Sequence, residues 1–384
     1  MAVRSVDIVA AGPPSADPYD PAAPAWALAA GFVARGADVR VVHPVGPEAA
    51  PPPDGVTAVP LADALKHPGA AREPVDRLAA ALPRLRPEVE LIVRDPLGLG
   101  RLGLRRWSRG RPIVAGFVRG LETEGHARAH AGPTRGSVVG RLDVWRDRRS
   151  VQRLEAAALA ETDLLFFDRP ALGPVLARDH GVPERRLVPA PPPVAAAGPV
   201  PGRAEARGAL RLPADVPIVA VAAPTDDGPG SGVAPAVEAF RRVRPFFPGA
   251  RLVVVGAAAP AEPGVVRVPE RDRASFEGVL AAADVALFLG PAIGFDPGVV
   301  LALRAACLPL VGPAVGLPLE PGGLVGRLGG DDPAEAASTL AELLADPALR
   351  RDRLTGAAAY AARYAPARVA ETVEIAVARL RPAA

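Results

Sequence analysis

The sequence predicts an α/β protein made of two doubly wound domains. Short apolar runs alternate with stretches of helical spacing, which favours parallel sheets covered by helices on both faces. A proline-rich run at residues 188–201 interrupts this alternation, and the alternation restarts after it. A length of 384 residues also fits two domains of common size better than one core.

Apolar runs in the first half predict strands, and the spacing between them predicts helices. The expected strands are at residues 6–10, 39–42, 56–59, 91–93, 113–118 and 164–167, and the expected helices at 26–36, 74–82 and 151–160. In the second half we expect strands at 218–221, 252–255, 265–268 and 284–289, and helices at 233–243, 274–282 and 301–306. Proline lacks an amide donor, so the run at 188–201 is expected to be an extended connector.

Composition excludes several classes of protein. No apolar run is long enough to span a bilayer, and charges at Arg4 and Asp7 argue against an export signal. Cys307 is the sole cysteine, which excludes a disulfide framework or a cysteine-ligated zinc site. A reducing cytoplasm is the expected compartment.

The basic residues do not form a nucleic-acid footprint. Net charge is only +3, Lys66 is the sole lysine, and arginines alternate with acids along most of the chain. Residues 101–111 carry a local arginine excess, interpreted as a solvated helix face, with contact to a phosphate or, at the membrane periphery, to an anionic lipid as the alternative. The spacing of His126 and His130 would suit a metal pair on one helix. No third ligand is evident, so we expect a surface loop and no metal site.

Several phrases resemble one enzyme family in their order and spacing. DLLFFD at 163–168, GVPERRLVP at 181–189 and FPGARLVVVG at 247–256 are followed by DVALFL at 284–289 and CLPLV at 307–311. Together they resemble the family 4 retaining glycosyltransferases of the B-type fold. The resemblance implies two Rossmann-like domains that face a central cleft. It places an acceptor-side domain at 1–195, a linker at 196–214, a donor-side domain at 215–357, and a C-terminal helix at 358–384 that crosses back to the first domain.

The same resemblance implies a donor site after the first strand of the second domain, on the loop at 223–232. Family members bind the donor diphosphate there with an Arg and a Lys, because charge grows on the leaving group. Here Ser231 stands at the Lys position and Thr225 lies near the Arg position. Backbone amides of the loop, including that of Gly232, could still hold phosphate; an ordinary glycine-rich turn is the alternative.

Two glutamates of the family's donor site are also replaced. Aligning on Pro309 puts the ribose-binding Glu at Ala302, and the other falls on the loop at 293–294. Asp296 could replace the acid of this loop, the first of the two, as a catalytic residue, although an Asp before a proline also caps loops and helices. The expected donor-binding residues are Thr225, Ser231, Gly232, Gly294, Phe295, Pro297, Gly298 and Val299.

In the first domain, Asp95 is the second candidate catalytic residue, at the end of a strand. Arg94, Arg119 and His126 are candidates for the acceptor or phosphate side, where family members often have a His.

Two hypotheses for function remain. One is an active glycosyltransferase with a divergent donor site, which takes a nucleotide-sugar as substrate, needs no cofactor, and uses a saccharide or lipid-linked acceptor. The other is an inactive member of the fold that serves as a binding or partner subunit of an active transferase. In both cases we expect nucleoside diphosphates to bind weakly, because charged ligand positions are lost.

Overall fold

The protein is seen here in a computed structural model that describes the residues 3–10, 14, 17, 19–20, 22–44, 50–61, 89–92, 113–118, 149, 152–153, 155–156, 159–160, 162–167, 172–222, 232–256, 261–269, 272–289, 294–313, 315–316, 321–330 and 332–380. The chain divides into two compact units. The first consists of Met1–Ser15, Pro24–Pro193 and Pro366–Ala384, and the second of Ala16–Ala23 and Val194–Ala365.

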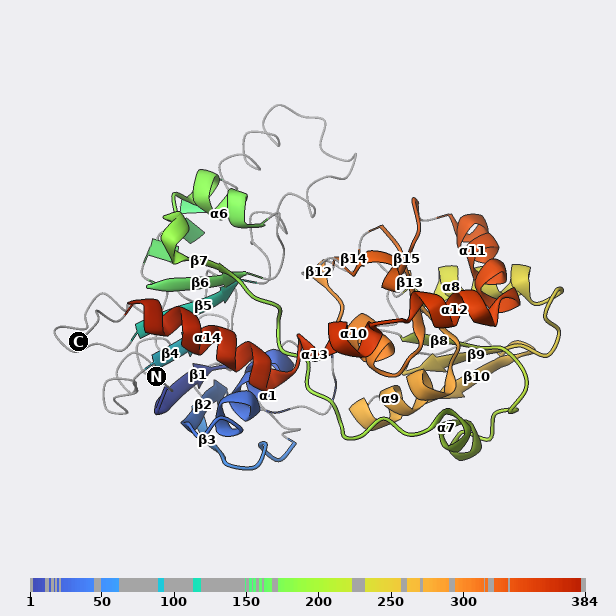
Figure 1. Ribbon diagram of the computed structural model, residues 1–384, viewed down its shortest axis with the longest axis horizontal. Coiled ribbons are helices and arrows are strands. Elements are labelled where there is room, and N and C mark those ends of the chain that lie inside the picture. The colour runs from blue at the N-terminus through green and yellow to red at the C-terminus, as the bar shows by residue number, and fades with distance from the viewer. Residues whose placement is uncertain are drawn as a thin grey trace. The chain divides into compact units, whose positions relative to one another are not determined.

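Parallel strands form a seven-stranded sheet in the described part of the first unit, in the order β3-β2-β1-β4-β5-β6-β7 (Figure 1). The strands are β1 (Ser5–Val9), β2 (Asp38–Pro44), β3 (Val56–Leu61), β4 (Val89–Ile92), β5 (Ile113–Val118), β6 (Leu164–Phe167) and β7 (Leu187–Pro189). The order reverses between β1 and β4, as in doubly wound folds. Every strand predicted for this half is confirmed.

The last helix of the chain packs on the first unit. The helices with described bounds in this unit are α1 (Ala23–Val33), α6 (Leu172–His180) and α14 (Pro366–Leu380), with a 3₁₀ turn at Glu184–Arg186. A Cβ on Gly31 of α1 would lie 2.3 Å from the Pro366 carbonyl oxygen, so only glycine allows this approach. Just after α1, Arg35 donates to the Glu374 carboxylate of α14 at 2.6 Å and 3.0 Å.

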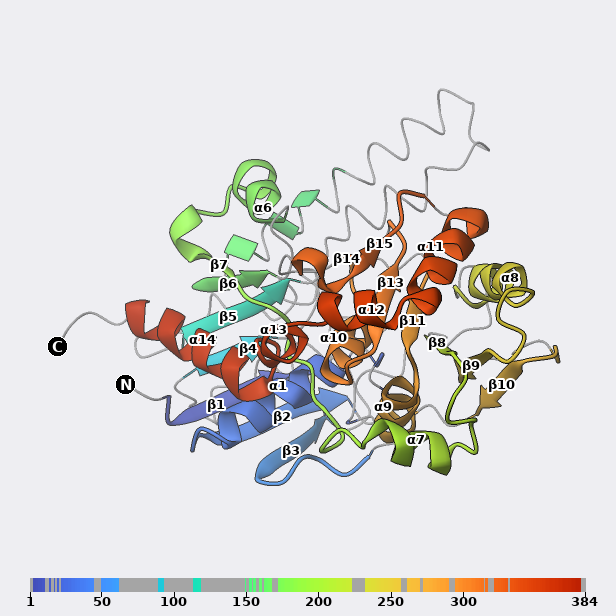
Figure 2. The same ribbon diagram turned by 45° about the vertical axis from the view of Figure 1, so that its right-hand side comes forward.

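The second unit contains a six-stranded parallel sheet in the order β10-β9-β8-β11-β13-β15 (Figure 2). The strands are β8 (Ile218–Ala222), β9 (Arg251–Val255), β10 (Val265–Val268), β11 (Val285–Phe288), β13 (Leu308–Val311) and β15 (Gly326–Arg327). The helices are α7 (Arg203–Ala209), α8 (Val233–Val243), α9 (Arg273–Ala282), α10 (Pro297–Arg304), α11 (Pro333–Ala345), α12 (Pro347–Arg353) and α13 (Ala357–Ala362). A short pair, β12 (Gly294–Phe295) and β14 (Val315–Gly316), and a 3₁₀ turn at Gly322–Leu324 complete the described elements.

Alternate residues of each buried strand serve two separate cores in the second unit. Val219 and Val221 of β8 pack with α8 and α11 on one face of the sheet. Ile218 and Ala220 of the same strand pack on the other face with α9, α10 and α13. This two-residue period explains why these strands are apolar throughout. The α/β fold class with doubly wound sheets is therefore confirmed.

Both units use the same device to join two neighbouring strands. Asp163, before β6, accepts a 3.0 Å hydrogen bond from the Val114 amide of β5. Asp284, before β11, accepts a 2.9 Å hydrogen bond from the Ile218 amide of β8. The backbone amide of each Asp donates to the carbonyl of the same partner residue at 2.8 Å. The Asp that opens each of the phrases DLLFFD and DVALFL therefore has a structural role.

The segment expected to be a linker, residues 196–214, contains helix α7. Arg207 of α7 is buried and donates to the Ala282 carbonyl at 3.0 Å and to Asp284 at 2.9 Å. These contacts hold α7 on the second unit, beside α9 (Figure 2). The prolines on either side of α7 are extended, but the helix between them is part of the domain.

Candidate functional site

Helices α8, α9 and α10 all begin at the carboxyl edge of the second sheet. They follow β8, β10 and the β11–β12 segment, and these sheet strands are parallel. The strand order reverses between β8 and β11, where ligands of doubly wound sheets bind. Helix N-termini carry partial positive charge and free amides, which suit an anionic ligand. This edge is therefore the candidate site of the second unit.

Asp296 lies at the start of α10 and caps it. Its Oδ1 accepts a 2.8 Å hydrogen bond from the Gly298 amide, and Pro297 occupies the first turn. A carboxylate and a proline at these positions favour helix initiation. The structure thus gives Asp296 the capping role that the sequence left open, and keeps its carboxylate at the candidate site.

Tyr19 reaches this helix terminus from the chain segment that follows β1. A Cβ on Gly298 would lie 2.4 Å from the Tyr19 hydroxyl and 2.7 Å from the Phe288 ring, so glycine is required. The hydroxyl is buried and has no hydrogen-bond partner among the described residues. Its ring also contacts Phe276 of α9, with centroids 5.8 Å apart. Tyr19 therefore packs between the first turns of α9 and α10.

Burial perturbs the pKa of Tyr19 and of Asp296, and the two groups also act on each other. Burial raises the pKa of Asp296 to about 6, while the Gly298 amide and the Tyr19 hydroxyl oppose the rise. Burial, and then the Asp296 charge, raise the pKa of Tyr19 well above its usual value. The hydroxyl is thus close enough to act on the carboxylate, without a hydrogen bond of normal geometry. A carboxyl group with a pKa near 6 can exchange protons at neutral pH.

Arg273 supplies a cation at the same edge. It is the first residue of α9, whose N-cap Asp272 accepts from the Ser275 amide at 2.9 Å. Arg273 Nε is buried without a hydrogen-bond partner in the described part of the chain. Burial lowers its pKa, while the charges of Glu277 and Asp17 raise it; an arginine remains protonated in either case. Because Arg273 and Phe276 are three residues apart on α9, they share the helix face that meets Tyr19.

The position expected for a ribose-binding acid is inside the core. Ala302 is fully buried on α10, in the cluster that includes α9 and α13. Two residues later, Arg304 donates to Glu277 at 2.7 Å and to the Gly198 carbonyl. Arg304 therefore holds α10 against α9 and the connector, away from a ligand role.

The structure brings together only some of the predicted site residues. Gly294, Phe295, Asp296, Pro297, Gly298 and Val299 form the continuous β12–α10 entry. Phe295 and Val299 are buried, and Phe295 stacks on Tyr364 at 5.5 Å, which leaves their backbone for ligand contact. Gly232 precedes α8 with a left-handed φ of 74°, where glycine is favoured. The remaining predicted residues, Asp95, Arg94, Arg119, His126, Thr225 and Ser231, lie outside the described residues.

Sequence reasoning missed Tyr19 and Arg273. Tyr19 lies in the loop after β1, and its aromatic ring in that loop was the available signal. Arg273 had no distinguishing signal among 45 basic residues.

The described residues contain no group of three His, Cys, Asp or Glu side chains placed to hold a metal ion. Among the helices that the structure describes, none has the length and apolar character needed to cross a membrane.

Solved glycosyltransferases share this fold. Sucrose-phosphate synthase from Thermosynechococcus elongatus matches with a TM-score of 0.69 at 16% identity, over 98% of this chain and 99% of that one. A glycosyltransferase from Rickettsia africae matches with a TM-score of 0.71 at 10% identity, over the full length of both chains. Anabaena HepE, solved in complex with UDP and glucose, matches with a TM-score of 0.68 at 12% identity, over 98% of this chain and 100% of that one.

The sequence itself matches no family model and no curated protein. At such low identity the structural similarities establish the fold, which is the two-domain B-type fold of glycosyltransferases. The predicted B-type fold is thereby confirmed.

Proposed function

We propose that this protein binds a nucleotide-sugar at the carboxyl edge of the second sheet and transfers the sugar to a saccharide or lipid-linked acceptor. The observation that carries the proposal is that Arg273, at the start of α9, and Asp296, at the N-cap of α10, both lie at this edge. One is a guanidinium with no partner for its Nε in the described chain, and the other is a carboxyl group whose pKa is raised to about 6.

Arg273 is the residue we assign to the donor diphosphate. A diphosphate leaving group needs fixed positive charge, because negative charge grows on it as the glycosidic bond breaks. The family's two basic positions are empty of charge here, at Ser231 and near Thr225. Arg273 is the first residue of α9, which begins at the same sheet edge where the loop before α8 ends. Arg273 can therefore neutralise the diphosphate together with the backbone amides of α9 and α10.

Asp296 is the residue we assign to the neighbourhood of the transferred sugar. It stands at the α10 terminus, in the loop that carries the first acid in the family. A carboxyl group with a raised pKa can hold or release the acceptor proton near neutral pH. Its contact with Tyr19 makes this proton exchange depend on the segment after β1.

A non-catalytic role is the second candidate, and a specific observation favours it. Ala302 stands buried where the family has the carboxylate that binds the ribose, and Asp296 already serves as a helix cap. In that case the protein would be a binding or partner subunit of an active transferase.

Calorimetric titration of the full chain with UDP, GDP and ADP tests the binding step. We expect one nucleotide to bind, and Arg273→Gln to weaken it about 10-fold or more, since a hydrogen bond to a charged group contributes about 1.5–3 kcal/mol. Arg351→Gln, an exposed arginine of α12, is the matched control and should bind as the parent does. No binding by any nucleotide, or equal binding by Arg273→Gln, would refute the proposal.

Release of nucleoside diphosphate from the corresponding nucleotide-sugars, with mixed saccharide acceptors, tests the chemical step. We expect release by the parent protein, and loss of release with retained binding in Asp296→Asn. Binding without release from any nucleotide-sugar would reject the catalytic assignment in favour of the second candidate.

A further inference from the structure

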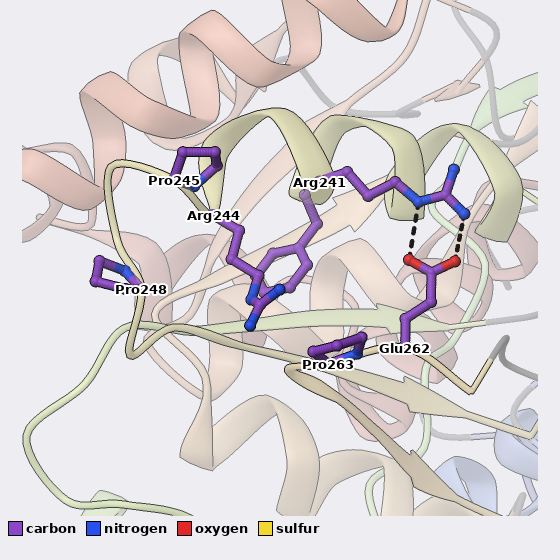
Figure 3. A pocket seen from close by; sticks show the side chains of 7 residues that line it. Arg241, Arg244, Pro245, Pro248, Glu262 and Pro263 are labelled. Atoms are coloured by element: carbon purple, nitrogen blue, oxygen red, sulfur yellow. Dashed lines mark hydrogen bonds and ion pairs between the residues drawn. The ribbon is translucent and has the colours of Figure 1, made fainter.

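A recess lies at the opposite edge of the second sheet from the candidate functional site. It is lined by the last turn of α8, the turn after α8 and the segment before β10, through Phe240, Arg241, Arg244, Pro245, Pro248, Glu262 and Pro263 (Figure 3). Helix α8 ends, and β9 and β10 begin, at the amino edge of the parallel sheet. The recess has a volume of about 260 Å³. That size fits a small molecule and is slightly below the usual range for ligand sites.

The two arginines of the recess differ in their pairing. Arg241 Nε donates to the Glu262 carboxylate at 2.8 Å, its second terminal nitrogen also contacts that carboxylate, and its other one donates to Glu238 at 3.1 Å. Glu262 is therefore neutralised, and the pKa of its carboxyl group is lowered by Arg241. In Figure 3 Arg241 turns toward Glu262, whereas Arg244 extends toward the loop that carries Pro263.

Arg244 brings an unmatched positive charge to the recess. No described acid pairs with its side chain, and its Nε is buried without a hydrogen-bond partner. A Cβ on Gly264 would lie 3.3 Å from this Nε and 3.5 Å from the Phe240 ring, so glycine makes room for the guanidinium there. Gly264 also has a φ of +86°, which other residues rarely adopt. The glycine thus leaves room for the Arg244 side chain beside Phe240, and no described residue supplies an acceptor for its Nε.

The remaining walls are apolar. Phe240 and the prolines 245, 248 and 263 surround the charged group. Proline has no amide donor, so Pro245, Pro248 and Pro263 offer a ligand only hydrocarbon surface and carbonyls. A ligand that fits must satisfy one guanidinium and cover apolar surface at the same time.

We propose that this recess binds a small monocarboxylic acid with an apolar or aromatic body. The carboxylate would accept hydrogen bonds from the Arg244 guanidinium, whose planar donors match carboxylate geometry. The body would lie against Phe240 and the prolines. Since the C-terminal carbonyls of α8 oppose an anion, binding is expected in the millimolar range. The site is separate from the nucleotide site and does not depend on the proposed function.

Benzoate is the probe for this site. In a titration of the full chain followed by amide NMR, we expect saturable shifts at residues 240–248 and 262–264. Benzamide has the same body without the charge, so its binding should be at least 10-fold weaker. Benzoate that binds no better than benzamide, or gives no saturable shift in this region, would overturn the proposal without any variant being needed.

Substitution of single arginines shows which of them binds the carboxylate. Arg244→Gln should weaken benzoate at least 10-fold, whereas Arg242→Gln, an exposed neighbour paired with Glu238 at 3.0 Å, should leave it unchanged. Equal weakening by both variants would mean that overall charge, and not this recess, attracts the anion. Amide spectra of the ligand-free variants show whether each variant is folded. If Arg244→Gln does not fold, the comparison of benzoate with benzamide on the parent protein still tests the proposal.

Discussion

The Gly298 amide donates a 2.8 Å hydrogen bond to the Asp296 carboxylate, so the candidate catalytic acid is also the N-cap of α10. The stability of that helix and the charge at the site are therefore linked. Binding or releasing a proton at Asp296 changes both at once.

This linkage predicts a pH-dependent stability. Because the pKa of Asp296 is raised from 3.8 to about 6, the folded state binds the proton more tightly than the unfolded state. The contribution of Asp296 to the free energy of unfolding is therefore greatest below pH 4 and is lost as the pH rises toward 6. Asp296→Asn keeps the cap and should remove this slope, so that relative to the parent it gains up to about 3 kcal/mol between pH 4 and 7.

Urea denaturation at several pH values measures this gain. Asp332→Asn, the exposed cap of α11 that accepts from the Ala334 amide at 2.8 Å, controls for loss of a capping charge. A parallel pH profile for Asp296→Asn and the parent would contradict the raised pKa.

The Tyr19 hydroxyl provides a second test of the same site. It is buried without a partner in the described chain, so Tyr19→Phe should be neutral or stabilising by up to about 1 kcal/mol. Because the hydroxyl opposes the rise in the Asp296 pKa, its removal should also shift the pH transition upward. The same denaturation series reports both effects. A loss of stability well above 1 kcal/mol would show that the hydroxyl is hydrogen-bonded in solution.

The fold could be predicted because its signals are local. The apolar strands of the second unit are buried on both faces, so each is a continuous run in the sequence, as in Val253 and Val254 of β9, which serve opposite cores. The proline-rich run likewise shows where the first pattern ends. Helix α7 was missed because it is short and lies between prolines, and its buried Arg207 reads as a surface residue.

The candidate site could be predicted only where it follows a strand directly. Asp296 and Gly298 lie in such a segment and carry recognisable roles as cap and close-contact glycine. Tyr19 and Arg273 reach the same place from distant segments, and no periodicity connects them with α10. Their contribution depends on tertiary packing, which a single sequence does not reveal.

Restoring the family's ribose-binding acid should fail in this protein. Ala302 is fully buried among apolar side chains, so Ala302→Glu would place a carboxylate in the core. We expect a loss of several kcal/mol in the free energy of unfolding, measured by denaturation at neutral pH. Ala302→Gln, similar in size but uncharged, separates the effect of charge from that of volume. A stable Ala302→Glu variant that binds a nucleoside diphosphate more tightly would show that position 302 faces the ligand.

The turn after α10 offers a stabilising substitution. Ala306 has a left-handed φ of 52°, and the Cys307 amide closes the turn by donating to the Ala302 carbonyl at 2.9 Å. Glycine is the usual residue at this position of a helix end, because a Cβ there costs energy. Ala306→Gly should therefore raise stability by about 0.5–1 kcal/mol. Ala305→Gly, one residue earlier with a φ of −83°, should lower the stability. A less stable Ala306→Gly variant and a more stable Ala305→Gly variant would show that the backbone at Ala306 is not strained.

Asp284 should be among the most sensitive positions of the second unit. Its carboxylate accepts from Arg203 at 2.7 Å, from Arg207 at 2.9 Å and from the Ile218 amide at 2.9 Å. Removing it leaves buried Arg207 without its acid and the β8 amide without its acceptor, and such losses cost about 3–5 kcal/mol. Asp284→Ala should therefore unfold at much lower denaturant than the parent. Arg203→Gln removes the more exposed partner and should cost about 1 kcal/mol or less. Comparable losses in the two variants would mean that the buried Arg207 pair is not what holds this edge of the sheet.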